Sequence, residues 1–209
     1  MNILFDLDGT LTDSGEGIIN CAIVALEHFG LPIPERNTLR VFVGPPLRDT
    51  FPKFGVPQER VDEAIAVYRE RYVRIGKYEN FPYPGIQQML EQLQKDGHHL
   101  YIATSKPEQM AIEILEYFGL AKYFDMICGA TMDERRNRKE MVIEYLLERI
   151  DRDCIMVGDT IYDVDGANYH NLPCIAVSWG YGDISQMAAA GAKIVHNTTE
   201  LLEAIKEAC

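Results

Sequence analysis

Long hydrophobic runs are lacking in this chain of 209 residues. No stretch approaches the ~18 consecutive apolar residues that span a bilayer, so no membrane contact is expected. Asp6 and Asp8 interrupt the first apolar run and no basic segment precedes it, so we do not expect this run to be a secretory signal peptide. We therefore expect a soluble, cytoplasmic protein.

Basic residues are also scarce. The chain has 32 acidic and 20 basic side chains, a net charge of −12. A surface of this sign repels the phosphates of nucleic acids, and no run of basic residues offsets the repulsion. We expect no nucleic-acid partner, whereas a site that requires a cation is compatible with this charge.

Paired metal-binding residues are lacking as well. The five cysteines show no Cys-x-x-Cys spacing and the five histidines are scattered, so no zinc site is predicted. Three cysteines lie in or beside apolar runs, where cysteine behaves as a small hydrophobic residue. These are Cys128, Cys154 and Cys174.

What the chain does contain is an alternation of strand and helix patterns. Hydrophobic residues make up 47% of the sequence, enough for a substantial core. Six short apolar runs predict buried strands, and helical periodicity lies between several of them. The strands are predicted at 2–7, 98–104, 124–128, 154–158, 173–178 and 193–196, and the helices at 85–96, 107–118 and 139–150. This alternation predicts an α/β fold with a Rossmann-like parallel sheet.

Residues 15–80 interrupt the alternation. They contain only helical patterns, with apolar stripes at 18–29 and 61–72 and a turn-rich loop at 43–48. The simplest interpretation is a small α-helical domain inserted after the first strand. The core domain would then comprise residues 1–14 and 81–209.

Two carboxylates end the first predicted strand, in Phe5-Asp6-Leu7-Asp8-Gly9-Thr10. Ligand sites of open parallel sheets lie at the carboxyl ends of the strands. Buried carboxylates at that position need a cation or strong hydrogen-bond donors. Gly9 allows the backbone to turn and direct N–H groups toward an anion.

A second acidic group follows the strand predicted at 154–158. Asp159 ends the strand and Asp163 lies four residues later, near a helix start. Together with Asp6 and the backbone carbonyl of Asp8, these carboxylates would form an oxygen-rich site that suits Mg²⁺. Either acidic group by itself is equally compatible with ordinary helix capping.

Hydroxyl and ammonium groups could complete an anion site. Thr104 and Ser105 end the second predicted strand just before a helix, where backbone N–H groups favour anions. The alternative for Ser105 is a capping role for the helix at Pro107. Lys139 begins the next helix and, taken alone, has the character of a solvated surface residue.

In this order, the motifs resemble the four motifs of the haloacid dehalogenase superfamily, over nearly the whole chain. The resemblance is strongest to its phosphoglycolate phosphatase-like branch, in which a helical cap domain follows the first motif. The motifs are Asp6-x-Asp8-Gly9-Thr10, Thr104, Lys139 and Gly158-Asp159-x-x-x-Asp163.

The resemblance implies a phosphatase that works through an aspartyl-phosphate. Asp6 would attack phosphorus, while Asp8 would protonate the leaving oxygen and then activate water. The presence of Asp8 argues against a dehalogenase, whose halide leaving group needs no acid. The cofactor would be Mg²⁺, and the metal-binding residues would be Asp6, Asp8, Asp159 and Asp163.

The remaining implied roles concern the phosphoryl group. Thr104 would be catalytic, and Gly9, Thr10 and Ser105 would bind phosphate. Lys139 would stabilise negative charge on the nucleophile and the phosphate. Several basic residues precede Lys139, so aligning the motif one residue earlier would assign this role to Arg138. Lys106 is a third candidate for the role.

Substrate choice is expected to reside in the inserted domain at 15–80. Arg48 in its turn-rich loop could bind a substrate carboxylate, as in phosphoglycolate, or be an ordinary surface arginine. The expected substrate is a small-molecule phosphate ester such as phosphoglycolate. A 5′-nucleotidase, a pyrophosphatase, a phosphosugar mutase and a non-enzymatic phospho-receiver remain alternatives, and the protein would be a monomer or homodimer.

Overall fold

The computed structural model describes residues 1–133 and 135–208, so Glu134 and Cys209 lie outside the described residues. The chain divides into two compact units. One unit comprises Met1–Thr12 and Pro82–Cys209, and the other comprises Asp13–Phe81. Within the described ranges, no helix combines the length and apolar character needed to cross a membrane.

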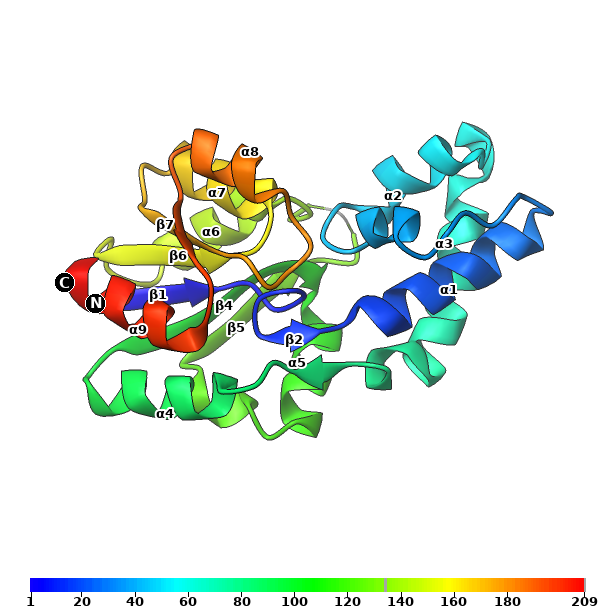
Figure 1. Ribbon diagram of the computed structural model, residues 1–209. Coiled ribbons are helices and arrows are strands. Elements are labelled where there is room, and N and C mark those ends of the chain that lie inside the picture. The colour runs from blue at the N-terminus through cyan, green and yellow to red at the C-terminus, as the bar shows by residue number, and fades with distance from the viewer. Residues whose placement is uncertain (134, 209) are drawn as a thin grey trace. The chain divides into compact units, whose positions relative to one another are not determined.

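The first unit contains a six-stranded parallel sheet in the order β5-β4-β1-β6-β7-β8 (Figure 1). This arrangement confirms the predicted α/β class with a Rossmann-like sheet. The strands are β1 (Asn2–Phe5), β4 (His99–Pro107), β5 (Met126–Ala130), β6 (Cys154–Gly158), β7 (Cys174–Val177) and β8 (Lys193–Val195). Two short strands, β2 (Thr12–Asp13) and β3 (Phe81–Pro82), pair where the chain passes between the units.

Helices cover both faces of the large sheet, with α6, α7 and α8 on one face and α4, α5 and α9 on the other (Figure 1). They are α4 (Ile86–Lys95), α5 (Glu108–Tyr117), α6 (Lys139–Leu147), α7 (Ile161–Tyr169), α8 (Ile184–Ala189) and α9 (Thr198–Ala208), with a 3₁₀ turn η5 at Ala121–Tyr123. Under α6 to α8, one buried cluster includes Leu4, Met156 and Val142. Cys128, Cys154 and Cys174 are buried there with free thiols, as their apolar surroundings predicted.

The ends of two strands differ from the sequence prediction. β1 stops at Phe5 rather than at residue 7, because the Leu7 carbonyl accepts hydrogen bonds from Thr10, Leu11 and Thr12 N–H groups in a turn. β4 continues to Pro107, which pairs with Ala130 after an irregularity in register. Thr104 and Ser105 therefore lie inside this strand. The alternative interpretation of Ser105, as the cap of α5, is wrong, since the N-cap residue of α5 is Pro107.

The second unit, Asp13–Phe81, consists mainly of helices and 3₁₀ turns. It contains α1 (Gly15–His28), α2 (Leu47–Thr50), α3 (Val61–Arg74) and the 3₁₀ turns η1 (Thr38–Phe42), η2 (Phe51–Phe54), η3 (Gln58–Arg60) and η4 (Gly76–Tyr78). Aromatic rings join its interior: Phe51 contacts Phe42 and Tyr68, and Tyr68 stacks on Tyr72. α1 and η4 approach so closely at Gly17 that a Cβ there would lie 1.9 Å from the Gly76 carbonyl oxygen.

Candidate active site

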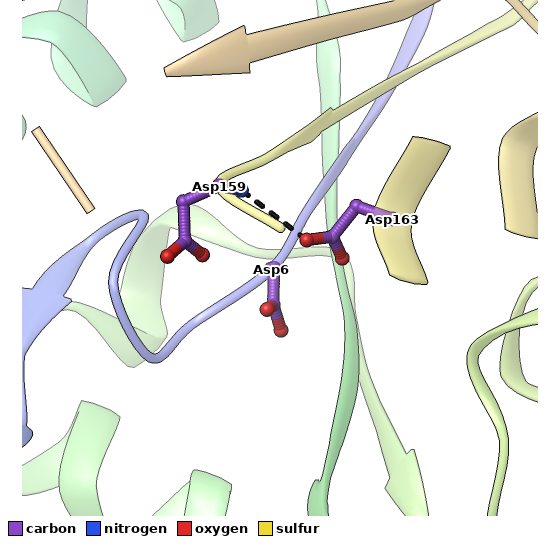
Figure 2. Close-up of side chains that lie close together, drawn as sticks. All are labelled: Asp6, Asp159 and Asp163. Carbon is purple, nitrogen blue, oxygen red and sulfur yellow. Dashed lines mark hydrogen bonds between the residues drawn. The ribbon is translucent and has the colours of Figure 1, made fainter. Parts of the chain in front are cut away.

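Three buried aspartates meet at the carboxyl ends of β1 and β6. Asp6 directly follows β1, Asp159 directly follows β6, and Asp163 lies in the first turn of α7. One carboxylate oxygen from each lies within 4.8 Å of the others (Figure 2). The three residues are at most 5% exposed. The sheet topology thus brings together carboxylates from the two acidic segments that the sequence analysis identified.

Asp163 is held by a capping box at the start of α7. Its Oδ2 accepts hydrogen bonds from Thr160 N (3.0 Å), Thr160 Oγ1 (2.9 Å) and Asp159 N (3.2 Å), the last drawn in Figure 2. Asp163 therefore both caps α7 and contributes a carboxylate to the acidic group. Helix capping and a role in the acidic group are thus compatible for this residue. A Thr-x-x-Asp pattern is the sequence signal for Thr160, which the motif analysis missed.

Lys139 connects two of the aspartates. Its Nζ lies 2.8 Å from Asp6 Oδ1 and 2.7 Å from Asp163 Oδ1, and it donates a hydrogen bond to the Ala103 carbonyl oxygen (2.8 Å). Only 3% of the residue is exposed, so the interpretation of Lys139 taken alone, as a solvated surface residue, is wrong. The side chain of Arg138, by contrast, is 72% exposed and its guanidinium lies 4.0 Å from Glu140.

Asp8 has a separate ammonium partner. Lys106 Nζ donates a hydrogen bond to Asp8 Oδ2 at 2.6 Å, and both side chains are almost completely buried. The side chain of Asp8 is therefore not one of the three clustered carboxylates. Only its backbone carbonyl remains as the metal ligand that the sequence analysis assigned to this residue.

Asp159 is bound by neutral donors. Thr10 Oγ1 donates to its Oδ1 (3.1 Å), and the backbone N–H of Tyr181 donates to its Oδ2 (2.9 Å). In the described part of the chain, no ammonium or guanidinium group pairs with this carboxylate. Thr10, expected to bind phosphate, thus holds Asp159 in this structure. The Tyr181 contact has no sequence signal, because its donor is the backbone.

Burial and mutual repulsion change the proton affinities of these groups. Burial raises the pKa of Asp6 to about 6; the Lys139 ammonium opposes this rise and the Asp163 carboxylate adds to it. Burial, with the charges of Asp163 and Asp6, holds the pKa of Asp159 well above its ordinary value. For Lys139, burial acts to lower the pKa, but the attraction of both carboxylates outweighs it and the pKa is raised. Lys139 therefore remains charged, whereas Asp6 and Asp159 resist ionisation.

These residues fit a divalent cation. Asp6 Oδ1 and Asp163 Oδ1 are buried, and the ammonium of Lys139 lies within 2.8 Å of both. The site contains four carboxylates, the three of the cluster and that of Asp8, and two ammonium groups, Lys139 and Lys106. Their formal charges sum to −2. Hard oxygen ligands and this negative charge match Mg²⁺ or a similar ion.

The other residues expected at the site occupy varied positions. Thr104 is buried, and its Oγ1 accepts a hydrogen bond from Lys106 N (3.2 Å). Ser105 is half-buried in β4. Gly9 has φ +84°, and a Cβ there would lie 2.1 Å from Asp159 Oδ2, so this turn requires glycine. Arg48 belongs to the second unit, where its guanidinium pairs with Asp62 at 2.5 Å; its contact with a substrate remains a prediction.

Asp159→Asn is expected to raise the free energy of unfolding of the metal-free protein at pH 8. The raised pKa of Asp159 means that the folded state binds its proton more tightly than the unfolded chain. The stability that protonated Asp159 contributes is therefore fully present below the pKa of this group in the unfolded chain, near pH 4. It is lost as pH rises through the higher pKa of the folded state. Asparagine removes the charge and keeps an oxygen acceptor for Tyr181.

Urea unfolding in chelator at pH 5 and pH 8 measures this effect. The expected result is a gain in the free energy of unfolding at pH 8 and a smaller gain at pH 5, where more of the wild-type Asp159 is protonated. A variant less stable than wild type at pH 8 would contradict the assignment of Asp159 as a strained buried carboxylate.

Comparisons with known proteins agree with this geometry. A family model described as haloacid dehalogenase-like hydrolase matches residues 3–177. A 5′-nucleotidase from Pseudomonas aeruginosa is 41% identical over 192 residues, covering 90% of this chain and 87% of that protein. A crystal structure described as a predicted phosphatase from Clostridium acetobutylicum has a TM-score of 0.94 and 43% identity, covering 99% of this chain and 98% of that chain.

A longer relative also matches. The tyrosine-protein kinase PtkA from Mycobacterium tuberculosis is 40% identical over 183 residues, covering 86% of this chain. This chain spans 62% of the length of that kinase. Enzymes of the matching family generally use a divalent metal, and an acidic group suited to one is present. The chain belongs to the haloacid dehalogenase-like hydrolases, and it is a phosphatase of that family.

Proposed function

We propose that this phosphatase is a Mg²⁺-dependent phosphomonoester hydrolase in which Asp6 is the nucleophile. The observation that carries the proposal is the position of Asp6, a buried carboxylate at the end of β1, 2.8 Å from the ammonium of Lys139. The positive charge favours the carboxylate form and compensates its repulsion from an incoming phosphate. A bound Mg²⁺ would supply further charge neutralisation for the phosphate and the nucleophile.

In the first step, an Asp6 oxygen forms a bond to phosphorus as the bond to the leaving oxygen breaks, and Asp8 gives that oxygen a proton. In the second step, Asp8 takes a proton from water, which attacks phosphorus and releases Asp6 and inorganic phosphate. Asp8 Oδ1 is buried and accepts no hydrogen bond from the described residues, whereas Oδ2 is bound by Lys106. Oδ1 is therefore the oxygen that we assign to proton transfer.

The substrate class that we propose is a small phosphate ester, with nucleoside monophosphates placed first. Support comes from the 41% identity to a 5′-nucleotidase over most of both chains. Phosphoglycolate, favoured by the motif resemblance, needs a cationic partner for its carboxylate, and the candidate Arg48 is paired with Asp62 in this structure. That pairing lowers the rank of phosphoglycolate relative to nucleotides.

The test is a screen of phosphate release, with and without Mg²⁺, over nucleoside monophosphates, phosphoglycolate, sugar phosphates and pyrophosphate. We expect turnover that chelator abolishes and added Mg²⁺ restores, with the highest kcat/KM for a nucleoside monophosphate. Arg48→Gln serves as the matched variant, and it is expected to leave nucleotide turnover within about threefold. Turnover that persists in chelator would overturn the metal requirement, and a higher kcat/KM for phosphoglycolate would overturn the substrate ranking.

A further inference from the structure

The loop formed by residues 179–182 (Trp-Gly-Tyr-Gly) follows β7 and encloses Asp159 from one side. A Cβ on Gly180 would lie 2.3 Å from both Asp159 Cβ and Oδ2, and a Cβ on Gly182 would lie 2.2 Å from the Asp159 carbonyl oxygen. Real Cβ atoms are not found at such distances, so side chains at 180 and 182 would displace Asp159 or the loop. Together with Gly9, glycines therefore surround this carboxylate from two separate loops.

The same loop also supplies directed hydrogen bonds. Tyr181 N donates to Asp159 Oδ2 (2.9 Å), and Gly182 N donates to the Asp159 carbonyl oxygen (3.1 Å). The indole N–H of Trp179 donates to the Thr10 carbonyl oxygen (3.1 Å), while Thr10 Oγ1 donates to Asp159 Oδ1 (3.1 Å). The loop thus fixes Asp159 directly and also through the turn that follows Asp8.

These contacts orient the carboxylate without neutralising it. Each Asp159 oxygen accepts a hydrogen bond from a neutral donor, and each has a second lone pair. Partners of this kind orient metal-binding carboxylates and raise metal affinity. The close approach of Gly180 leaves Asp159 no room for another side-chain position in that direction.

We propose that the loop 179–182 is a positioning element that fixes the Asp159 carboxylate for a divalent cation, and that Trp179 couples this loop to the Asp8–Thr10 turn. The inference rests on the proposed function, since it takes Asp159 as a cation ligand. It adds a role to residues outside the four motifs of the resemblance.

The test compares Gly180→Ala with a matched control, Gly191→Ala. The φ of Gly180 lies outside the left-handed region, and the three atoms nearest to an added methyl group all belong to the Asp159 side chain. Gly191 has φ +95°, and no atom lies within 4 Å of the position that its Cβ would take. Its substitution therefore strains the backbone without a steric clash. Both variants are first checked for cooperative urea unfolding in chelator.

Mg²⁺ is then titrated into each protein by calorimetry and by intrinsic fluorescence. Trp179 is the single tryptophan of the chain, so its emission reports on this loop alone. We expect a saturable change in wild-type emission, a Kd raised about 10- to 100-fold in Gly180→Ala, and a Kd within about twofold of wild type in Gly191→Ala. Trp179→Phe, measured by calorimetry, should weaken binding several-fold and provides the test if Gly180→Ala does not fold.

An unchanged Kd in both Gly180→Ala and Trp179→Phe would overturn the inference, as would wild-type emission that does not respond to Mg²⁺. Equal weakening in Gly191→Ala would also overturn it, because the effect would then be general strain. These outcomes are separate from failure of the proposed function, which is judged by phosphate release and by the Asp6 variant.

Discussion

Asp6→Asn is expected to lower kcat by about 10⁴-fold or more, because an amide cannot form the aspartyl-phosphate. The fold should persist, since the change keeps the shape of the side chain and removes a charge that burial disfavours. The pKa of Asp6, raised to about 6, indicates that the folded state already holds its proton more tightly than the unfolded chain does. We therefore expect the free energy of unfolding at pH 8 to be equal to or higher than that of wild type.

Asp8→Asn provides the matched comparison. With p-nitrophenyl phosphate, whose leaving group needs no proton, Asp8→Asn should still form the aspartyl-phosphate and release a burst of p-nitrophenolate. Hydrolysis of the intermediate should be slow, because no base activates water. Asp6→Asn should give no burst. Near-wild-type turnover by Asp6→Asn, after mass spectrometry has excluded deamidation, would show that another group is the nucleophile.

Lys139→Met is expected to lower both activity and stability. The methionine keeps the aliphatic length of the side chain but leaves Asp6 and Asp163 without the ammonium that lies within 2.8 Å of each. Removing one partner of a buried ion pair typically costs about 3–5 kcal/mol. The rate should also fall by about 10³-fold, because the positive charge beside Asp6, the proposed nucleophile, is lost.

Urea unfolding in chelator and phosphate-release kinetics in Mg²⁺ measure the two effects. Lys106→Met is the control for stability, because it removes a similarly buried ammonium that pairs with Asp8 instead. Added Mg²⁺ should restore part of the lost stability in Lys139→Met by neutralising the freed carboxylates. If Lys139→Met keeps wild-type stability in chelator, the ammonium is not compensating the acidic group.

The sequence by itself determined the architecture of the large sheet. Apolar runs such as 154–158 match buried strands, because a strand covered on both faces must be apolar along its whole length. Asp6 and Asp159 were predicted as site residues for the same reason, since polar residues that end such strands lie at the edge where ligand sites form. Helical periodicity at 15–80 predicted an inserted helical domain, and the second compact unit of the structure comprises Asp13–Phe81.

Only the tertiary structure decided how the side chains pair. Lys139 has the local pattern of a surface residue, yet its ammonium is buried because α6 brings it against β1 and α7. The partners Thr10 and Asp159 lie 149 positions apart, and Asp8 and Lys106 lie 98 apart. Local patterns record burial and helix geometry, whereas such contacts depend on distances in space that the periodicity of one segment does not encode.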